Sequence, residues 1–165
     1  PIAGDRADMQ ALGTCYQHYS GGLMLDCLLL YLHTFDSQDL IDEYQHHGFA
    51  KERITLALRK DGRLCGCIII HRTNIGLNLS DLTNCVKVLI TDSRHVDRSV
   101  IQNALRRIFR DYQLNGDMPV LMYPVEAVEK LNIPMEKKYC LWILNTRYSD
   151  KYFKFIDRMF RLAKK

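Results

Sequence analysis

A two-residue turn near the middle of the chain constrains the fold more than any other feature of the sequence. Asp61 and Gly62 separate an alternating stretch, 53–59, from a β-branched apolar run, 64–70. An Asp-Gly pair between two such stretches predicts a tight β-hairpin, because both turn positions need positive φ angles. We therefore expect an antiparallel strand pair with its turn at these two residues.

Helices and further strands are expected on both sides of this hairpin. Apolar residues recur at helical spacing over 5–19 and over 37–48, and each pattern ends at glycine. No strand is evident before Asp5. The other expected elements are strands at 85–90, 119–123 and 139–144, and helices over 98–112, 125–131 and 149–162. This order predicts an α/β domain with a mixed sheet.

Length and composition indicate one globular domain over 1–165. The chain has 165 residues, of which 47% are hydrophobic, and a chain of this size forms a sizeable core without disulfides or metals. The longest strictly apolar run, 27–32, has six residues, whereas a membrane helix needs about 20. No transmembrane segment is expected. Because the chain opens Pro-Ile-Ala-Gly without a Met, we interpret it as a processed chain or a piece of a longer protein.

The cysteines and histidines give no metal signature. The six cysteines lie in or beside apolar stretches and are expected to be small buried hydrophobes. Cys65 and Cys67, two apart on one strand, are expected to share a face. Neither zinc-type cysteine spacing nor an HExxH pattern occurs. These features predict no metal site and a reducing, cytoplasmic setting.

Two segments resemble the GNAT-type N-acyltransferase superfamily. The stretch 56–70, L-A-L-R-K-D-G-R-L-C-G-C-I-I-I, is similar to the central hairpin of that family, and 129–133, E-K-L-N-I, resembles its E-K-L-G-F segment. The resemblance covers roughly 5–145. It implies a GNAT-like three-layer domain whose mixed, mostly antiparallel sheet is flanked by helices. The implied reaction moves an acyl group to an amine from a thioester donor, which is acetyl-CoA, another acyl-CoA or an acyl carrier protein.

The resemblance also implies where such a donor binds. The strand at 85–90 would diverge from its neighbour at 119–123, and its backbone would pair with the pantetheine arm. The following loop would hold the pyrophosphate at the start of the next helix, where unpaired amides favour anions. The implied cofactor-binding residues are Val88, Leu89, Ile90, Arg94, His95, Val96, Arg98 and Ser99. Asp97 stands where the family has its first loop glycine, and it either repels the pyrophosphate or caps the helix.

Three residues are candidates for acid and base chemistry. Val128 stands where the family has its acidic tyrosine, so Tyr123 is the nearest substitute, although a strand-end tyrosine also serves for packing. An amine acceptor has to lose a proton, and His71 and Asp92, each placed just past a strand, could accept it. Each is also explained as a solvated loop residue. The catalytic candidates are Tyr123, His71 and Asp92.

Other functions remain open at this stage. Asp97 and Val128 equally suit a catalytically silent GNAT-like module that binds a ligand or partner within a larger regulatory protein. The segment 147–165 carries seven basic and two acidic residues and suits an acidic partner, such as an acyl carrier protein, anionic lipid or a neighbouring domain. The polar and apolar stretch 74–84 is either a half-buried loop or a cover over a ligand. Nucleic-acid binding ranks last, because the net charge is only +4.

Overall fold

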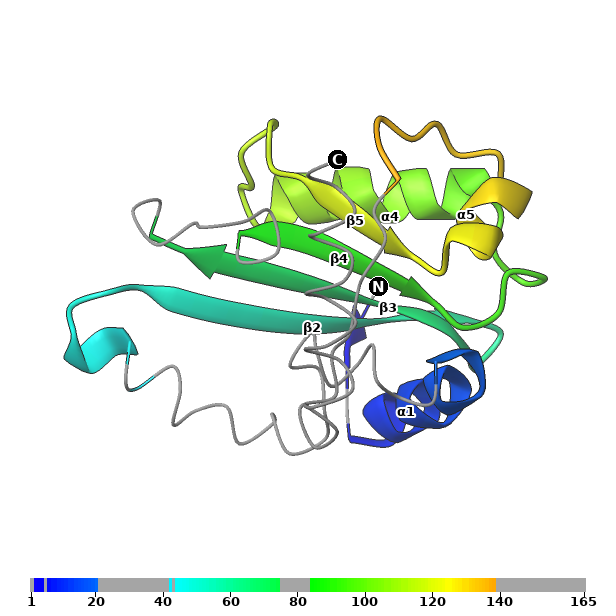
Figure 1. Ribbon diagram of the computed structural model, residues 1–165, viewed down its shortest axis with the longest axis horizontal. Helices are drawn as coiled ribbons and strands as arrows, with labels where there is room; N and C mark the ends of the chain where they lie inside the picture. The colour runs from blue at the N-terminus through cyan, green and yellow to red at the C-terminus, as the bar shows by residue number, and fades with distance from the viewer. Residues whose placement is uncertain (1, 5, 21–41, 43, 75–83, 139–165) are drawn as a thin grey trace, which may run out of the picture.

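The structure is a computed structural model of an α/β domain, in which residues 2–4, 6–20, 42, 44–74 and 84–138 are described. A five-stranded mixed sheet has the order β1-β2-β3-β4-β5. The elements are β1 (Ile2–Ala3), α1 (Arg6–Ser20), β2 (Lys51–Lys60), β3 (Arg63–Thr73), β4 (Cys85–Ile90), α4 (Arg98–Asp111), β5 (Val120–Tyr123) and α5 (Val125–Lys130). Figure 1 shows α4 and α5 on one side of the sheet and α1 on the other, so the described elements form three layers.

The central hairpin is confirmed. Strands β2 and β3 pair antiparallel along their lengths, and Asp61 and Gly62 form the turn with φ angles of 50° and 76°. Strand β3 also pairs antiparallel with β4, and β4 pairs parallel with β5. The expectation of no strand before Asp5 is wrong, because Ile2 and Ala3 pair antiparallel with Leu56 and Ala57 of β2. Two residues are too few to give a strand pattern in the sequence.

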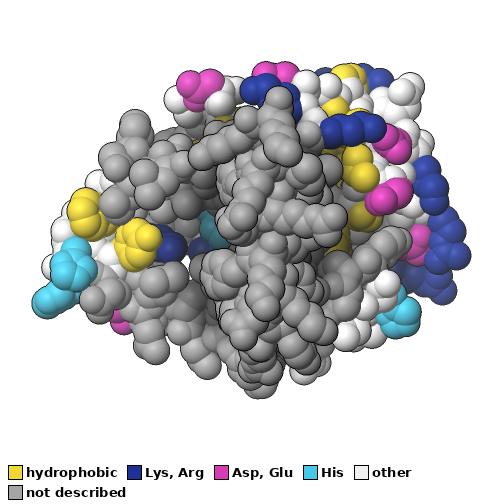
Figure 2. Space-filling model, viewed as in Figure 1, with side chains coloured by type: hydrophobic (Ala, Val, Ile, Leu, Met, Phe, Trp, Pro, Cys, Tyr) yellow, Lys and Arg dark blue, Asp and Glu magenta, His cyan; other side chains and the backbone are white. Residues whose placement is uncertain are grey.

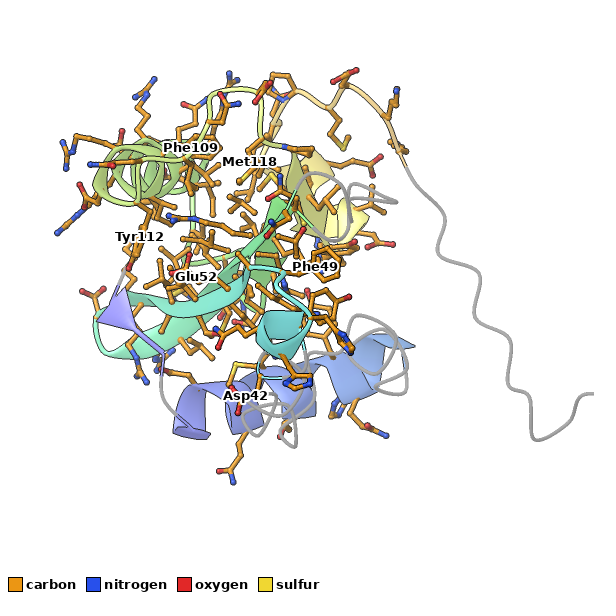
Figure 3. All side chains as sticks on the ribbon, turned by 90° about the vertical axis from the view of Figure 1, so that its left-hand side faces the viewer. Asp42, Phe49, Glu52, Phe109, Tyr112 and Met118 are labelled. Carbon is orange, nitrogen blue, oxygen red and sulfur yellow. The ribbon has the colours of Figure 1, made fainter. Side chains whose placement is uncertain are left out.

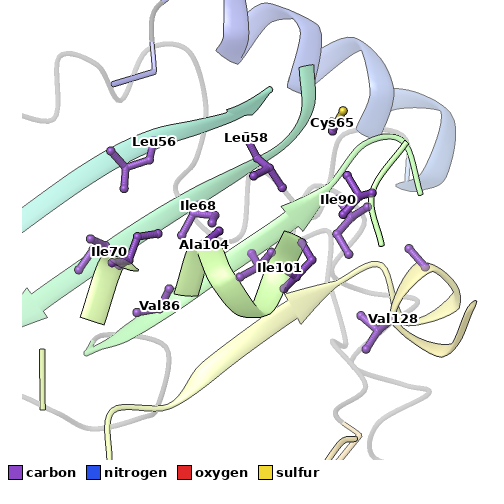
Figure 4. Packing of buried hydrophobic residues seen from close by; sticks show 14 residues of the cluster. Leu56, Leu58, Cys65, Ile68, Ile70, Val86, Ile90, Ile101, Ala104 and Val128 are labelled. Atoms are coloured by element: carbon purple, nitrogen blue, oxygen red, sulfur yellow. The ribbon is translucent and has the colours of Figure 1, made fainter. Parts of the chain in front are cut away.

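Each face of the sheet has its own apolar cluster. On the α4 side, alternate residues of β2, β3 and β4 pack against Ile101, Ala104 and Ile108 of α4 and against Val128 of α5 (Figure 4). On the other side, Met9, Leu12 and Tyr16 of α1 pack against Cys67, Ile69 and Leu89. Because side chains alternate between the faces of a strand, the central strands are buried on both sides.

The hairpin contains one irregularity that moves a cysteine. The register shifts after Leu58, which pairs with Gly66, whereas Arg59 pairs with Leu64. Cys65 is therefore left between two pairs, as in a β-bulge, and it belongs to the α4-side cluster while Cys67 belongs to the α1-side cluster. Simple alternation predicts a shared face, and that expectation is wrong. Cys65, Cys67 and Cys85 are buried, as expected, whereas Cys15 is only half-buried. Burial raises the pKa of the Cys67 thiol to about 12.

Most of the other expected elements are found within one or two residues of their expected bounds. The helix expected over 37–48 is described only in part; its end is marked by the Phe49 amide, which donates to the Tyr44 carbonyl, and by Gly48 with a φ of 76°. The strand expected at 139–144, the basic helix expected over 149–162 and most of the 74–84 connection lie outside the described residues. None of the helices in the described part of the chain is long and apolar enough to cross a membrane.

Gly66 lets β3 approach β4 closely. A Cβ atom at this position would lie 2.6 Å from the Leu89 carbonyl oxygen, which is part of the backbone and cannot rotate away. We predict that Gly66→Ala lowers the free energy of unfolding by about 1–3 kcal/mol, the usual effect of overpacking a core, measured by urea denaturation. The matched control is Gly13→Ala on α1, where a Cβ meets nothing within 4 Å. Equal stabilities of the two variants would contradict this role.

Candidate functional site

Strands β4 and β5 remain paired through the last residue of β5. The register runs from Val86 opposite Val120 to Leu89 opposite Tyr123, where β5 ends. Val88 and Leu89 are thus paired with β5 and also with β3, and Ile90 lies one residue beyond the last β5 pair. The expected divergence of the two strands is not found within them. At Val88 and Leu89 the backbone that was expected to pair with a pantetheine arm is occupied by neighbouring strands on both edges, whereas Ile90 is paired with β3 only.

Several backbone amides of the segment after β4 donate hydrogen bonds to acceptors within the chain. The Thr91 and Asp92 amides both donate to the Cys65 carbonyl, at 3.0 and 3.3 Å. The Arg94 amide donates to Asp92 Oδ1 at 3.0 Å. At the start of α4, the Val100 amide donates to Asp97 Oδ1 at 2.9 Å, and the Ile101 amide donates to the Asp97 carbonyl. An anion at this helix start would have to displace these acceptors.

The charged side chains of this loop also bind one another. The Asp92 carboxylate accepts hydrogen bonds from the Arg94 guanidinium and lies 2.9 Å from His95 Nδ1. These contacts, chiefly the hydrogen bond from Arg94, hold the pKa of Asp92 well below its usual range. A carboxylate held in this way is a weak proton acceptor, which argues against Asp92 as the base.

The remaining expected cofactor residues are likewise engaged. Ser99 Oγ donates to Asp97 Oδ1 at 2.6 Å, and Arg98 donates to the Asn132 carbonyl at 3.3 Å. Val96 is buried in the α4-side cluster. Asp97 has the extended backbone and the side-chain hydrogen bond of an N-cap, so the helix-capping interpretation of this residue is confirmed.

The three catalytic candidates do not converge. His71 lies within β3, which extends to Thr73, rather than past its end as expected. It pairs with Cys85 at the start of β4, whereas Asp92 follows the end of that strand. The length of β4, about 17 Å from Cys85 to Ile90, separates the two positions, and Asp92 lies two residues beyond the end of the strand. Because β3 and β4 are antiparallel, their carboxyl ends lie at opposite edges of the sheet.

Tyr123 lies on the α1 side of the sheet. It packs against the cluster that contains Leu89, and burial, together with the nearby Cys85 thiol, raises the pKa of its phenol. Val128, which stands in the place of the family's tyrosine, is buried against the α4-side cluster. The two positions are thus on opposite faces, and Tyr123 faces the same side as His71.

A second group of ionisable side chains, which sequence reasoning did not assemble, lies on that side. Lys87 of β4 is only 3% exposed, and its Nζ lies 3.5 Å from His71 Nε2. Lys51 and Arg53 of β2 lower the pKa of both residues by their charge. We call Lys51, Arg53, His71 and Lys87 the basic cluster. It lies at the end of the sheet face beyond the part that α1 covers (Figure 1).

Burial and mutual repulsion change the protonation of this cluster. Desolvation is the largest effect on His71, and with the charges of Lys87, Arg53 and Lys51 it lowers the pKa of the imidazole to about 3. Desolvation also lowers the pKa of Lys87, an effect that the nearby Cys85 opposes and that Arg53 and Lys51 reinforce. His71 is therefore neutral near pH 7 and can accept a hydrogen bond from Lys87.

Two sequence signals pointed to this cluster. Lys87 is the one charged residue in the apolar run C-V-K-V-L-I. Because side chains alternate between the two faces of a strand, Lys51 and Arg53 lie on the same face of β2 as Thr55 and Ala57. The register of the hairpin then places Arg53 opposite His71. The cluster is completed by the pairing of β4 with β3, the strand that precedes it in the sequence. This pairing could be inferred only from the resemblance.

Comparisons of the chain with protein-family models, curated proteins and solved structures found no match. Among the described residues, no group of three or more His, Cys, Asp or Glu side chains is placed to hold a metal ion.

The N-cap of α4 is tested by two substitutions of Asp97. We predict that Asp97→Ala lowers the melting temperature by about 2–4 °C, because the Val100 amide loses its acceptor, and that Asp97→Asn, which keeps a capping oxygen, changes it less. Scanning calorimetry measures both. Asp117→Ala, at an exposed turn position, is the control. A loss in the control equal to that of Asp97→Ala would contradict the capping role.

The lowered pKa of His71 predicts a specific pH dependence. In the unfolded chain the imidazole binds a proton near pH 6.5, whereas in the folded protein it does so only near pH 3. The unfolded state therefore binds more protons between these values, and stability from this group is lost as the pH falls through that window. We predict that His71→Gln loses less unfolding free energy than the wild type between pH 7 and pH 4, measured by urea denaturation. A loss as large as the wild type's would show that His71 does not titrate in this way.

Proposed function

We propose that the chain is a GNAT-like module that binds a ligand or a partner and does not transfer acyl groups. The GNAT-like part of the proposal is supported by the order of elements. Three antiparallel strands, β2 to β4, are followed by the α4 crossover and by β5, which is parallel to β4. This is the order that the hairpin and the E-K-L-N-I segment implied.

The absence of transfer chemistry is supported mainly by one observation. Four of the amides between β4 and the first turn of α4, those of Thr91, Asp92, Arg94 and Val100, already donate to acceptors of the chain itself, and the Val100 amide donates to the Asp97 carboxylate. A second negative group close to Asp97 would be repelled, and its cost rises as water is excluded. The pairing of β5 with β4 up to Leu89 adds to this argument.

Acyl transfer from a thioester donor to an amine is the second candidate function. One observation favours it: Tyr123, which ends β5, lies on the same side of the sheet as Lys87 and His71, and proton donors and acceptors gathered at one face could serve catalysis. In that case Tyr123 would protonate the departing thiolate, and Arg94 would contact the donor.

Donor binding and turnover distinguish the two functions. For the binding module we predict no change in melting temperature with acetyl-, butyryl- or long-chain acyl-CoA, and no loss of thioester absorbance when mixed amines are added. A donor at 100 times its dissociation constant would add about 2.7 kcal/mol of stability, which is readily measured. Free coenzyme A is the control for non-specific effects of its phosphates.

Amine-dependent thioester loss would overturn the binding-module proposal. The residue assignments of the second candidate are then tested by Arg94→Ala, which should weaken donor binding, and by Tyr123→Phe, which should slow turnover at unchanged donor affinity.

A further inference from the structure

The most unusual feature of the described residues is a lysine buried in the middle of a sheet. Lys87 is 3% exposed, and within the part of the chain that the structure describes, the group at hydrogen-bond distance from its ammonium is a neutral imidazole rather than a carboxylate. Burying a charge costs several kcal/mol unless an opposite charge compensates it. Burial lowers the pKa of Lys87, and a negative group close to it would offset this cost and keep the ammonium charged.

Neighbouring strands add positive charge to the same place. Arg53 and His71 are directly opposite each other in the β2–β3 ladder, His71 is opposite Cys85, and Lys87 follows two residues later in β4. Lys51 precedes Arg53 on the same side of β2. Figure 2 shows dark-blue basic side chains beside a cyan histidine in the left half of the molecule.

The alternation of β2 sends its carboxylate to the other face. Glu52, between Lys51 and Arg53, forms an ion pair with Arg72 on the α4 side, with a closest N–O distance of 3.2 Å. Figure 3 shows Glu52 on the same side as Tyr112, away from Phe49. At the far end of the α1 side, Asp8 pairs with Arg59. Neither of these carboxylates is placed to neutralise Lys87.

Aromatic side chains adjoin the basic cluster. Lys51 Nζ lies 4.2 Å from the centre of the Tyr44 ring. Phe49, two residues before β2, is 40% exposed. A ligand with an apolar or aromatic part next to its charged group would contact both features.

We propose that the basic cluster of Lys51, Arg53, His71 and Lys87 binds the anionic group, a phosphate or a carboxylate, of a small ligand whose apolar part contacts Tyr44 and Phe49. Lys87 and Arg53 supply the charge, and His71 holds the Lys87 ammonium in place. The inference rests on the proposed function and names the class of ligand that the module binds.

The test measures melting temperature against the concentration of inorganic phosphate, phenyl phosphate and acetate, with chloride at matched ionic strength as the reference. We expect a saturable rise with at least one anion, and a lower half-saturation concentration for phenyl phosphate than for inorganic phosphate. The anion with the lowest half-saturation concentration distinguishes a phosphate from a carboxylate ligand. The absence of a saturable rise with all three would overturn the proposal.

Charge-removing variants locate the site. Lys87→Met keeps the unbranched apolar part of the side chain and removes the ammonium, and it should raise the half-saturation concentration by about tenfold or more, the usual effect of losing a hydrogen bond to a charged group. Lys51→Met, at a half-exposed position that is less demanding for folding, should raise it several-fold. Lys60→Met, at the exposed hairpin end, should leave it unchanged. If the melting temperature rises with the same half-saturation concentration in the wild type, in Lys87→Met and in Lys51→Met, the proposal is overturned.

These results separate this inference from the proposed function. If no anion binds and thioesters are not consumed, the anion site falls while the binding module stands. If thioesters are consumed, the binding module falls, and the anion site is judged by the Lys87 and Lys51 variants alone.

Discussion

The fold depends on a central strand, β3, that is paired on both edges and buried on both faces. It joins β2 through a two-residue turn and joins β4 through a ladder that runs from Gly66 to His71. Because helices cover both faces of this strand, the distance between its backbone and the neighbouring strands is tightly constrained by packing. Gly66 meets this requirement where the Leu89 carbonyl approaches most closely. The positions of α1 and α4 follow from which side chains β3 presents to each of them.

The two faces of the sheet differ in character, and the difference arises from alternation within β2. Ile54, Leu56 and Leu58 point to the α4 side and join a continuous apolar cluster. The alternate residues of β2 lie on the α1 side and include Arg53, which directly precedes Ile54 and lies on the same side as His71 and Lys87. Helix α1 covers the part of this face that carries Cys67, Ile69 and Leu89. The part of this face that α1 does not cover is therefore polar because of the residues of the strands themselves.

The sequence was sufficient to predict the local elements, because their signals are local. The signals are the Asp61-Gly62 turn, the apolar run of β4 and the amphipathic pattern of α4, and each is contained within one continuous stretch of the sequence. The site was predicted poorly, because its geometry depends on strand direction. His71 and Asp92 both stand near the ends of apolar runs, yet the antiparallel pairing of β3 and β4 places them at opposite edges of the sheet. The bulge at Cys65 also depends on contacts with the next strand, since its carbonyl accepts the amides that follow β4.

The two ends of β4 differ in how their charges are compensated, and this bears on where a ligand can bind. After β4, the Asp92 carboxylate accepts hydrogen bonds from Arg94 and lies 2.9 Å from His95, and the Asp97 carboxylate accepts one from the Val100 amide. Near the start of β4, Lys87 and His71 are flanked by the charges of Lys51 and Arg53. The helix start that would attract an anion in the implied arrangement is already capped by a negative charge. Among the described residues, the positive charges of Lys51, Arg53 and Lys87 lie instead near the start of the strand on the α1 side of the sheet, and the proposed anion site depends on this difference.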